Sequence, residues 1–308
     1  MRILVTGGTG FLGKHVSAEL NKSNNDIFTP SSKDLDLTNR RKTELYINDL
    51  KPDAILHMAA LCGGILANKN SPADFLHKNV DMGSNIYYAA MQVGCKKIYS
   101  LGSVCGYPKY CPTPFQEDNL WNGYPEETNA PYGMSKRLLL MMHQTYRAQY
   151  GFKGAHLIPV NLYGEYDHFD LVNSHVIPAL INKFTTAVKN NSPYVECWGT
   201  GEATREFLYA GDAAAAISKA VLTDFDSDLP INLGTGKEIS IKDLAHLIKD
   251  LTGYTGDIVF NGTVSDGQPK RMLDVSRAKE LLGWTADTSL RSGIAKTISW
   301  YLDSHVGA

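Results

Sequence analysis

The chain has 308 residues, of which 43% are hydrophobic and 20% charged, as in an ordinary soluble protein with one main core and a smaller lobe. The net charge is −2 and the basic residues are scattered, which argues against nucleic acid or an anionic membrane as the main partner. Five cysteines without a paired framework predict reduced thiols and a cytoplasmic location. A strand is predicted to begin at Arg2, so we expect no signal peptide, and no apolar run has the length of a membrane span.

Short apolar runs alternate with amphipathic segments through the first half of the chain. The predicted strands cover residues 2–6, 27–28, 54–58, 97–103 and 155–160. The predicted helices follow a glycine loop through residue 20 and then cover 41–50, 72–93 and 132–150. This alternation predicts an α/β fold with a Rossmann-type, doubly wound parallel sheet, in which functional groups lie at the carboxyl ends of strands.

The alternation is looser from about residue 165. Predicted helices cover 174–190, 210–223, 241–253, 276–282 and 289–305, with short strands at 194–198 and 258–260. Ser240, Ser276 and Ser289 precede amphipathic stretches and are expected to cap helices. We predict a nucleotide-binding domain over residues 1–164 and a smaller α/β substrate lobe over 165–308, with some later segments returning to the first domain.

A glycine-rich loop, G-G-T-G-F-L-G over residues 7–13, follows the first strand and opens the first helix. Its glycines would let the backbone approach a pyrophosphate, and the N-terminus of the helix would favour an anion. A glycine turn needed only for packing is the alternative, but the strand–loop–helix context favours a dinucleotide. The loop residues assigned to the cofactor are Gly7, Gly10, Phe11, Leu12 and Gly13.

The end of the second strand indicates the type of ribose. NAD sites usually carry an acid about 20 residues beyond the loop, whereas T-P-S-S-K at 29–33 has none before Asp34. Ser31, Ser32 and Lys33 could instead hold a 2′-phosphate, which favours NADP, and a plain polar turn is the alternative. Further cofactor contacts are expected at Asp36, Leu37, Ala59 and Ala60.

Tyr132 and Lys136, in the run Y-G-M-S-K, lie four residues apart and therefore on one face of a helix. A nearby ammonium would lower the pKa of the phenol from about 10, so that Tyr132 could exchange a proton with a carbonyl or alcohol oxygen. The spacing alone would fit an ordinary surface helix. Ser103 and Cys105 before the pair, and His175 after it, favour carbonyl–alcohol redox chemistry.

These residues resemble the extended short-chain dehydrogenase/reductase family of nucleotide-sugar enzymes. The glycine loop, Ser103 and the Tyr132–Lys136 pair match the superfamily. Cys105, the run S-H-V-I-P-A-L at 174–180 and W-G-T-G at 198–201 are more specific matches. The resemblance extends to about residue 300. Within the family, the chain is similar to the epimerase–reductases that convert GDP-4-keto-6-deoxy-D-mannose to GDP-L-fucose with NADPH, which implies an NADP(H)-dependent enzyme and a homodimer.

In a 4-keto sugar the carbonyl acidifies the hydrogens at C3 and C5, so inversion needs a base on one face of the ring and an acid on the other. A thiol and an imidazole suit these roles, because their pKa values of about 8.5 and 6.5 bracket neutrality. The resemblance implies that Cys105 and His175 form this pair, with Cys105 favoured as the base. Tyr132 would then protonate the C4 oxygen, Ser103 would hydrogen-bond it, and Lys136 would hold the nicotinamide ribose.

The resemblance also implies further contacts with the cofactor and with the GDP-sugar. Leu162 is expected at the cofactor. The residues expected at the GDP-sugar are Asn161, Lys183, Trp198, Arg205 and Arg271. Exposed helix charges are the alternative for Lys183 and, less so, for Arg205.

Other interpretations stay open. Cysteine is often buried as a small hydrophobe, which we expect of Cys62, Cys95 and Cys197, and we expect His57 to be a buried structural histidine. The cysteine and histidine spacings predict no metal site. Residues 104, 106, 121–125, 165–168 and 264–267 depart from the family pattern and are expected to lie in or near the sugar pocket.

These departures leave the sugar undecided. The alternatives are a 4-reductase, an epimerase–reductase for another GDP-4-keto sugar such as a dideoxy sugar or heptose, and a nucleotide-sugar 4-epimerase. A non-enzymatic NADP-binding sensor is a further possibility from another class, although a sensor would be expected to lose the Tyr132–Lys136 pair.

Overall fold

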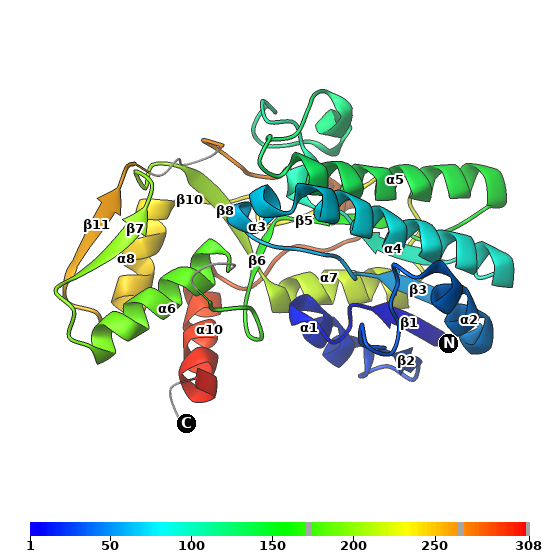
Figure 1. The fold of residues 1–308 in the computed structure, drawn as a ribbon, viewed down its shortest axis with the longest axis horizontal. Coiled ribbons are helices and arrows are strands. Elements are labelled where there is room, and N and C mark those ends of the chain that lie inside the picture. The colour runs from blue at the N-terminus through cyan, green and yellow to red at the C-terminus, as the bar shows by residue number, and fades with distance from the viewer. Residues whose placement is uncertain (171–173, 264–267, 306–308) are drawn as a thin grey trace.

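The computed structural model describes residues 1–170, 174–263 and 268–305, and its larger part is a parallel sheet between two helical layers (Figure 1). Six strands form this sheet in the order β2-β1-β3-β4-β5-β9. They are β1 (Arg2–Thr6), β2 (Asp26–Phe28), β3 (Ala54–His57), β4 (Ile98–Leu101), β5 (His156–Pro159) and β9 (Ile231–Leu233). After β1 the chain forms β2 on one side of β1 and then crosses to form β3 on the other side. The topological switch point therefore lies between β1 and β3.

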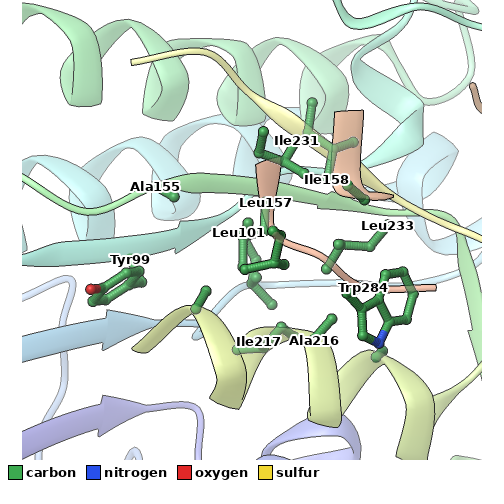
Figure 2. Close-up of a cluster of buried hydrophobic side chains, with 14 of the residues drawn as sticks. Tyr99, Leu101, Ala155, Leu157, Ile158, Ala216, Ile217, Ile231, Leu233 and Trp284 are labelled. Carbon is green, nitrogen blue, oxygen red and sulfur yellow. The ribbon is translucent and has the colours of Figure 1, made fainter. Parts of the chain in front are cut away.

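Successive residues of a strand point to opposite faces of the sheet. Both faces are apolar because apolar residues follow one another along the strands. Ile3 and Val5 of β1 belong to one buried cluster, which also holds Val16 of α1 (Phe11–Leu20) and Ile217 of α7 (Ala210–Leu222). Leu4 belongs to the cluster on the other face. That face is covered by α2 (Arg40–Leu50), α4 (Pro72–Val93) and α5 (Ala130–Tyr150). Figure 2 shows the first cluster between the sheet and α7.

The C-terminal lobe has a separate core. A three-stranded sheet contains β6 (Asn161–Tyr163), β8 (Thr204–Tyr209) and β10 (Glu238–Ser240), and a parallel pair contains β7 (Tyr194–Trp198) and β11 (Asp257–Asn261). The main helices of the lobe are α6 (Val176–Lys189), α8 (Ile241–Thr252) and α10 (Leu290–His305). Phe184, Leu244 and Ile294 from these three helices are fully buried together. Shorter elements are α3 (Ile65–Asn70), η1 (Val104–Gly106), η2 (Glu117–Trp121) and α9 (Ser276–Leu281).

The predicted Rossmann-type fold is confirmed, and most elements begin and end within a few residues of the predicted bounds. Two segments beyond residue 165, β9 and α7, belong to the larger sheet and its helical layer, whereas β6 belongs to the lobe. Ser240 caps α8 as predicted, accepting a hydrogen bond from the Asp243 N–H at 2.9 Å. The prediction for Ser276 is wrong, because the N-cap residue of α9 is Val275 and the Ser276 hydroxyl donates a hydrogen bond to the Asp274 carboxylate. Within the described ranges, no helix is long and apolar enough to cross a membrane.

Candidate active site

A cleft of about 690 Å³ opens at the carboxyl ends of the sheet strands. Its lining begins with Gly7 after β1, continues through Ala59 after β3 and Ser103 after β4, and reaches Val160 after β5. The ends of β1 and β3 flank the topological switch point. The wall on the lobe side includes Asn161, Leu162 and His175.

The glycine loop is shaped both by packing and by its opening onto this cleft. Gly7 has a left-handed φ of 75°, and a Cβ there would lie 2.7 Å from the Ala59 nitrogen. A Cβ on Gly13 would lie 2.0 Å from the Gly7 carbonyl oxygen, so packing alone requires these two glycines. Gly10 is the N-cap of α1 and has no side chain with which to cap it. The N-terminus of α1 is therefore open toward the cleft, which fits a pyrophosphate.

At the end of the cleft that is expected to hold the adenosine, the lining includes Ser32, Asp36 and Leu37. Ser31 lies outside the described lining, and its hydroxyl donates to Asp34 at 2.6 Å. Lys33 is exposed and also lies outside that lining. Of the three residues proposed for a 2′-phosphate, Ser32 is therefore the one that the structure places at the cleft. The remaining expected cofactor residues in the lining are Gly7, Gly10, Phe11, Leu12, Gly13, Ala59, Ala60 and Leu162.

All five predicted catalytic residues line the same cleft. They are Ser103, Cys105, Tyr132, Lys136 and His175. Ser103 follows β4 and caps η1, accepting a hydrogen bond from the Cys105 N–H at 3.2 Å. Tyr132 and Lys136 come from the first two turns of α5, and His175 is the N-cap of α6. Residues up to 72 positions apart thus meet because β4 ends, and α5 and the lobe helix α6 begin, beside the cleft.

The electrostatics of Tyr132 differ from the prediction. Burial raises the pKa of Tyr132 well above 10, and neighbouring thiols add to the shift. The Lys136 ammonium donates to the Leu101 carbonyl at 3.0 Å and lies 5.7 Å from the Tyr132 ring centroid, and it is not among the main causes of this pKa shift. The phenol is therefore protonated at neutral pH. This is the form required to donate a proton to a ketone oxygen.

Cys62 is a site residue that the sequence did not indicate. It was expected to be buried, as Cys95 and Cys197 are, but it is exposed in the cleft and its sulfur lies 3.0 Å from the Tyr132 hydroxyl. Asn79 fixes the preceding residue, accepting from the Leu61 N–H at 2.9 Å and donating to its carbonyl at 3.0 Å. The place of Cys62 in the loop that follows β3 at the carboxyl edge of the parallel sheet was the available signal.

The two candidates for sugar inversion have different surroundings. The Sγ atom of Cys105 receives a hydrogen bond from Arg271 Nη1 at 3.8 Å. Arg271 is buried and donates through Nε to Gln268. Arg271 thus lies beside the Cys105 thiol, and its expected contact with the GDP-sugar stays a prediction. The protein atoms packed around the His175 imidazole lower its pKa below 6.5, with a smaller contribution from His168.

The remaining substrate candidates lie on the lobe. Asn161 lines the cleft and donates to the Glu206 carbonyl at 2.8 Å. Lys183 donates to the Glu196 carbonyl and lies 5.2 Å from the centre of the exposed Trp198 ring. Arg205 donates to the Thr204 carbonyl at 2.8 Å. Lys183, Trp198 and Arg205 lie outside the described lining of the cleft.

Among the positions that depart from the family pattern, Asp167 and His168 line the cleft, in agreement with the expectation for residues 165–168. Val104 lines it as well. Residues 264–267, to which the same expectation applied, lie outside the described residues.

The fold and the cleft define a nucleotide-binding enzyme of the short-chain dehydrogenase/reductase type. The chain matches the NAD dependent epimerase/dehydratase family over residues 3–234, and it belongs to this family. It is 38% identical to GDP-L-colitose synthase of Yersinia pseudotuberculosis over 304 residues, which are 98% of each chain. It is also 38% identical to GDP-L-fucose synthase of Sinorhizobium fredii over 303 residues, 98% of this chain and 96% of the relative. A GDP-L-fucose synthetase from Naegleria fowleri bound to NADP has a similar structure, with a TM-score of 0.89, 31% identity, and coverage of 100% of this chain and 95% of that one.

Proposed function

We propose that this protein is an NADPH-dependent epimerase–reductase that converts GDP-4-keto-6-deoxy-D-mannose to GDP-L-fucose. The observation that carries the proposal is the meeting of a thiol, an imidazole and a protonated phenol in one dinucleotide cleft, at Cys105, His175 and Tyr132. The family and the relatives named above support the same class of reaction.

The cofactor would lie along the edge of the sheet. The open N-terminus of α1 would hold the pyrophosphate, Ser32 would contact the phosphorylated ribose, and Lys136 would contact the nicotinamide ribose. Ala59 and Ala60 leave room for the dinucleotide between these points. When bound, NADPH supplies the hydride that reduces C4 of the sugar.

The protein side chains would carry every proton transfer. Cys105, with Arg271 as a hydrogen-bond donor to its sulfur, removes a proton next to the C4 carbonyl, and the negative charge moves onto the C4 oxygen. Ser103 and Tyr132 stabilise that oxygen by hydrogen bonds. His175 delivers a proton to the opposite face of the ring carbon, which inverts the centre. After C3 and C5 are inverted, Tyr132 donates its proton to the C4 oxygen during reduction.

The GDP moiety would extend onto the lobe. Trp198 exposes its indole, and the Lys183 ammonium lies over the same ring, so this pair offers a stacking surface for a purine next to a cation. Arg205, on β8, the next strand along the chain, has the planar fork that suits diphosphate oxygens.

We also propose that the enzyme is a cytoplasmic homodimer joined through α4 and α5. These helices expose four large hydrophobic side chains, and such side chains are common in interfaces. They are Leu76, Leu138, Met141 and Tyr150. Light scattering of the wild type and of Met141→Arg tests this: the wild type should be dimeric and the variant monomeric. A monomeric wild type would contradict it.

The catalytic proposal is tested by incubating the protein with GDP-4-keto-6-deoxy-D-mannose and NADPH in deuterated water. Cofactor oxidation with deuterium at C3 and C5 of the product is the expected result. Oxidation without label would indicate a 4-reductase, and failure to oxidise NADPH would remove this substrate. GDP-4-keto dideoxy sugars and heptoses, assayed in parallel, test the alternative substrates.

A further inference from the structure

Asp167 is a buried acid in the wall of the cleft for which the mechanism above has no role. It lies in the loop between β6 and α6 and is 8% exposed. Its Oδ1 atom accepts a hydrogen bond from the His168 N–H at 2.8 Å. Its Oδ2 atom is buried and has no hydrogen-bond partner within the described part of the chain. One half of the carboxyl group is therefore fixed and the other half is unused.

The backbone on the N-terminal side of Asp167 is held firmly. Tyr166 has a left-handed φ of 70°, which costs energy for a bulky residue and persists only where the surroundings enforce it. The Tyr166 ring packs at 5.2 Å from the Trp300 ring and 5.4 Å from the His15 ring, measured between centroids. The Lys14 ammonium lies 4.8 Å from its centre. The Glu165 carboxylate accepts a hydrogen bond from the Tyr209 hydroxyl at 2.9 Å. These contacts keep Asp167 in the wall rather than in solvent.

An unpartnered carboxyl oxygen is unfavourable in a protein interior, and natural structures contain few such atoms. Burial raises the pKa of Asp167 to about 7, so in a large fraction of the molecules this carboxyl carries a proton at neutral pH. A protonated carboxyl is a hydrogen-bond donor. The group therefore offers a buried donor with no acceptor among the described residues.

Asp167 lies at the reacting end of the cleft. Protein atoms packed around the Cys62 sulfur raise the pKa of this thiol, and Asp167 lies close enough that a charge on its carboxyl, when ionised, raises it further. The Cys62 sulfur in turn contacts the Tyr132 hydroxyl. His168 and His175, from the same loop region, line the cleft beside Asp167. An oxygen of a sugar placed to receive a proton from Tyr132 would thus be a new acceptor beside Asp167.

We propose that Asp167 is a further substrate-binding residue, whose protonated carboxyl donates a hydrogen bond through Oδ2 to an oxygen of the 4-keto sugar ring. This inference rests on the function proposed above. It assigns the sugar a third neutral donor in addition to Ser103 and Tyr132. A neutral acid can play this part because it stabilises negative charge on a sugar oxygen without adding a competing charge.

Two variants of similar size separate this role from a structural one. Asp167→Asn keeps an oxygen for the His168 N–H and provides an N–H donor in place of the acid, so we expect kcat/KM for the 4-keto sugar within about threefold of wild type. Asp167→Leu has no donor, and we expect kcat/KM to fall at least about tenfold, since a lost donor to a developing negative charge can cost 10²-fold. NADPH affinity, measured by fluorescence titration, should be unchanged in both variants.

The outcomes distinguish failure of this role from failure of the proposed function. If wild type does not turn over the 4-keto sugar, the proposed function fails and this role fails with it. If wild type is active and Asp167→Leu is equally active, the function stands and the hydrogen bond from Asp167 is refuted. Equal losses of turnover and NADPH affinity in Asp167→Leu would also refute it, because they would show a role in the shape of the loop.

Discussion

Glu206 offers a direct test of how the two halves of the site are held together. Its carboxylate is fully buried and accepts hydrogen bonds from the Leu273 and Gly236 N–H groups, both at 2.7 Å, and from the Thr235 N–H. It thereby joins β8, which carries Arg205, to the segment that carries Arg271. Replacing Glu206 by Ala would leave three backbone donors without an acceptor.

The magnitude follows from these three contacts. A hydrogen bond to a charged group contributes about 1.5–3 kcal/mol, but water can reach the half-buried Thr235 and Gly236, so we estimate a total loss of about 4 kcal/mol in the free energy of unfolding. For a chain of this size, that loss corresponds to a fall in Tm of roughly 8 °C. Glu206→Gln should lose less, since one oxygen remains.

Urea unfolding followed by circular dichroism measures this loss. Glu202→Ala is a matched control, because Glu202 lies just before the same strand but is exposed, and it should stay within about 0.5 kcal/mol of wild type. A loss below about 1 kcal/mol for Glu206→Ala would refute the view that Glu206 holds these segments together.

Three further predictions concern individual side chains. Tyr132→Phe removes the proton donor for reduction, so NADPH oxidation should slow by about 10²–10⁴-fold, while deuterium uptake at C3 and C5 should slow less because Ser103 still hydrogen-bonds the C4 oxygen; equal loss of both would contradict the assignment. Cys62 is exposed and Cys95 and Cys197 are buried, so mass spectrometry after brief alkylation should find label on Cys62 and none on the other two, with NADPH slowing the labelling. Burial lowers the pKa of His57 from 6.5 to about 3, so the unfolded chain binds a proton that the folded chain refuses, and stability falls as pH drops below 6.5. This loss in the free energy of unfolding should reach about 2 kcal/mol at pH 5. Denaturant titrations of His57→Gln should therefore show a smaller loss of stability between about pH 6.5 and pH 5 than those of wild type.

Local patterns explain why much of the fold could be predicted. The glycine loop, the alternating apolar strands and the cap at Ser240 depend on residues close together in the sequence, and each lies where it was expected. The cleft also brings together Ser103 and Tyr132, since parallel strands end and the helices after them begin at a common edge, and His175 reaches it from the start of α6 in the lobe.

Contacts between distant segments account for what the sequence did not predict. Arg271 reaches Cys105 across 166 residues through an irregular segment, for which periodicity gives no signal. The pKa of Tyr132 depends on burial by surrounding elements, whereas its spacing from Lys136 indicated only a neighbouring cation. Asp167 shows the same limit, because its unused oxygen is visible only once its neighbours are placed.

The central claim is that Cys105 removes the ring protons during inversion, and deuterium exchange in Cys105→Ser tests it most directly. The variant and wild type would each be incubated with GDP-4-keto-6-deoxy-D-mannose in deuterated water, and uptake at C3 and C5 followed by NMR. We predict that uptake falls at least about 100-fold while NADPH affinity stays unchanged. Uptake at the wild-type rate would contradict the role of this thiol and, with it, the inversion chemistry proposed for the cleft.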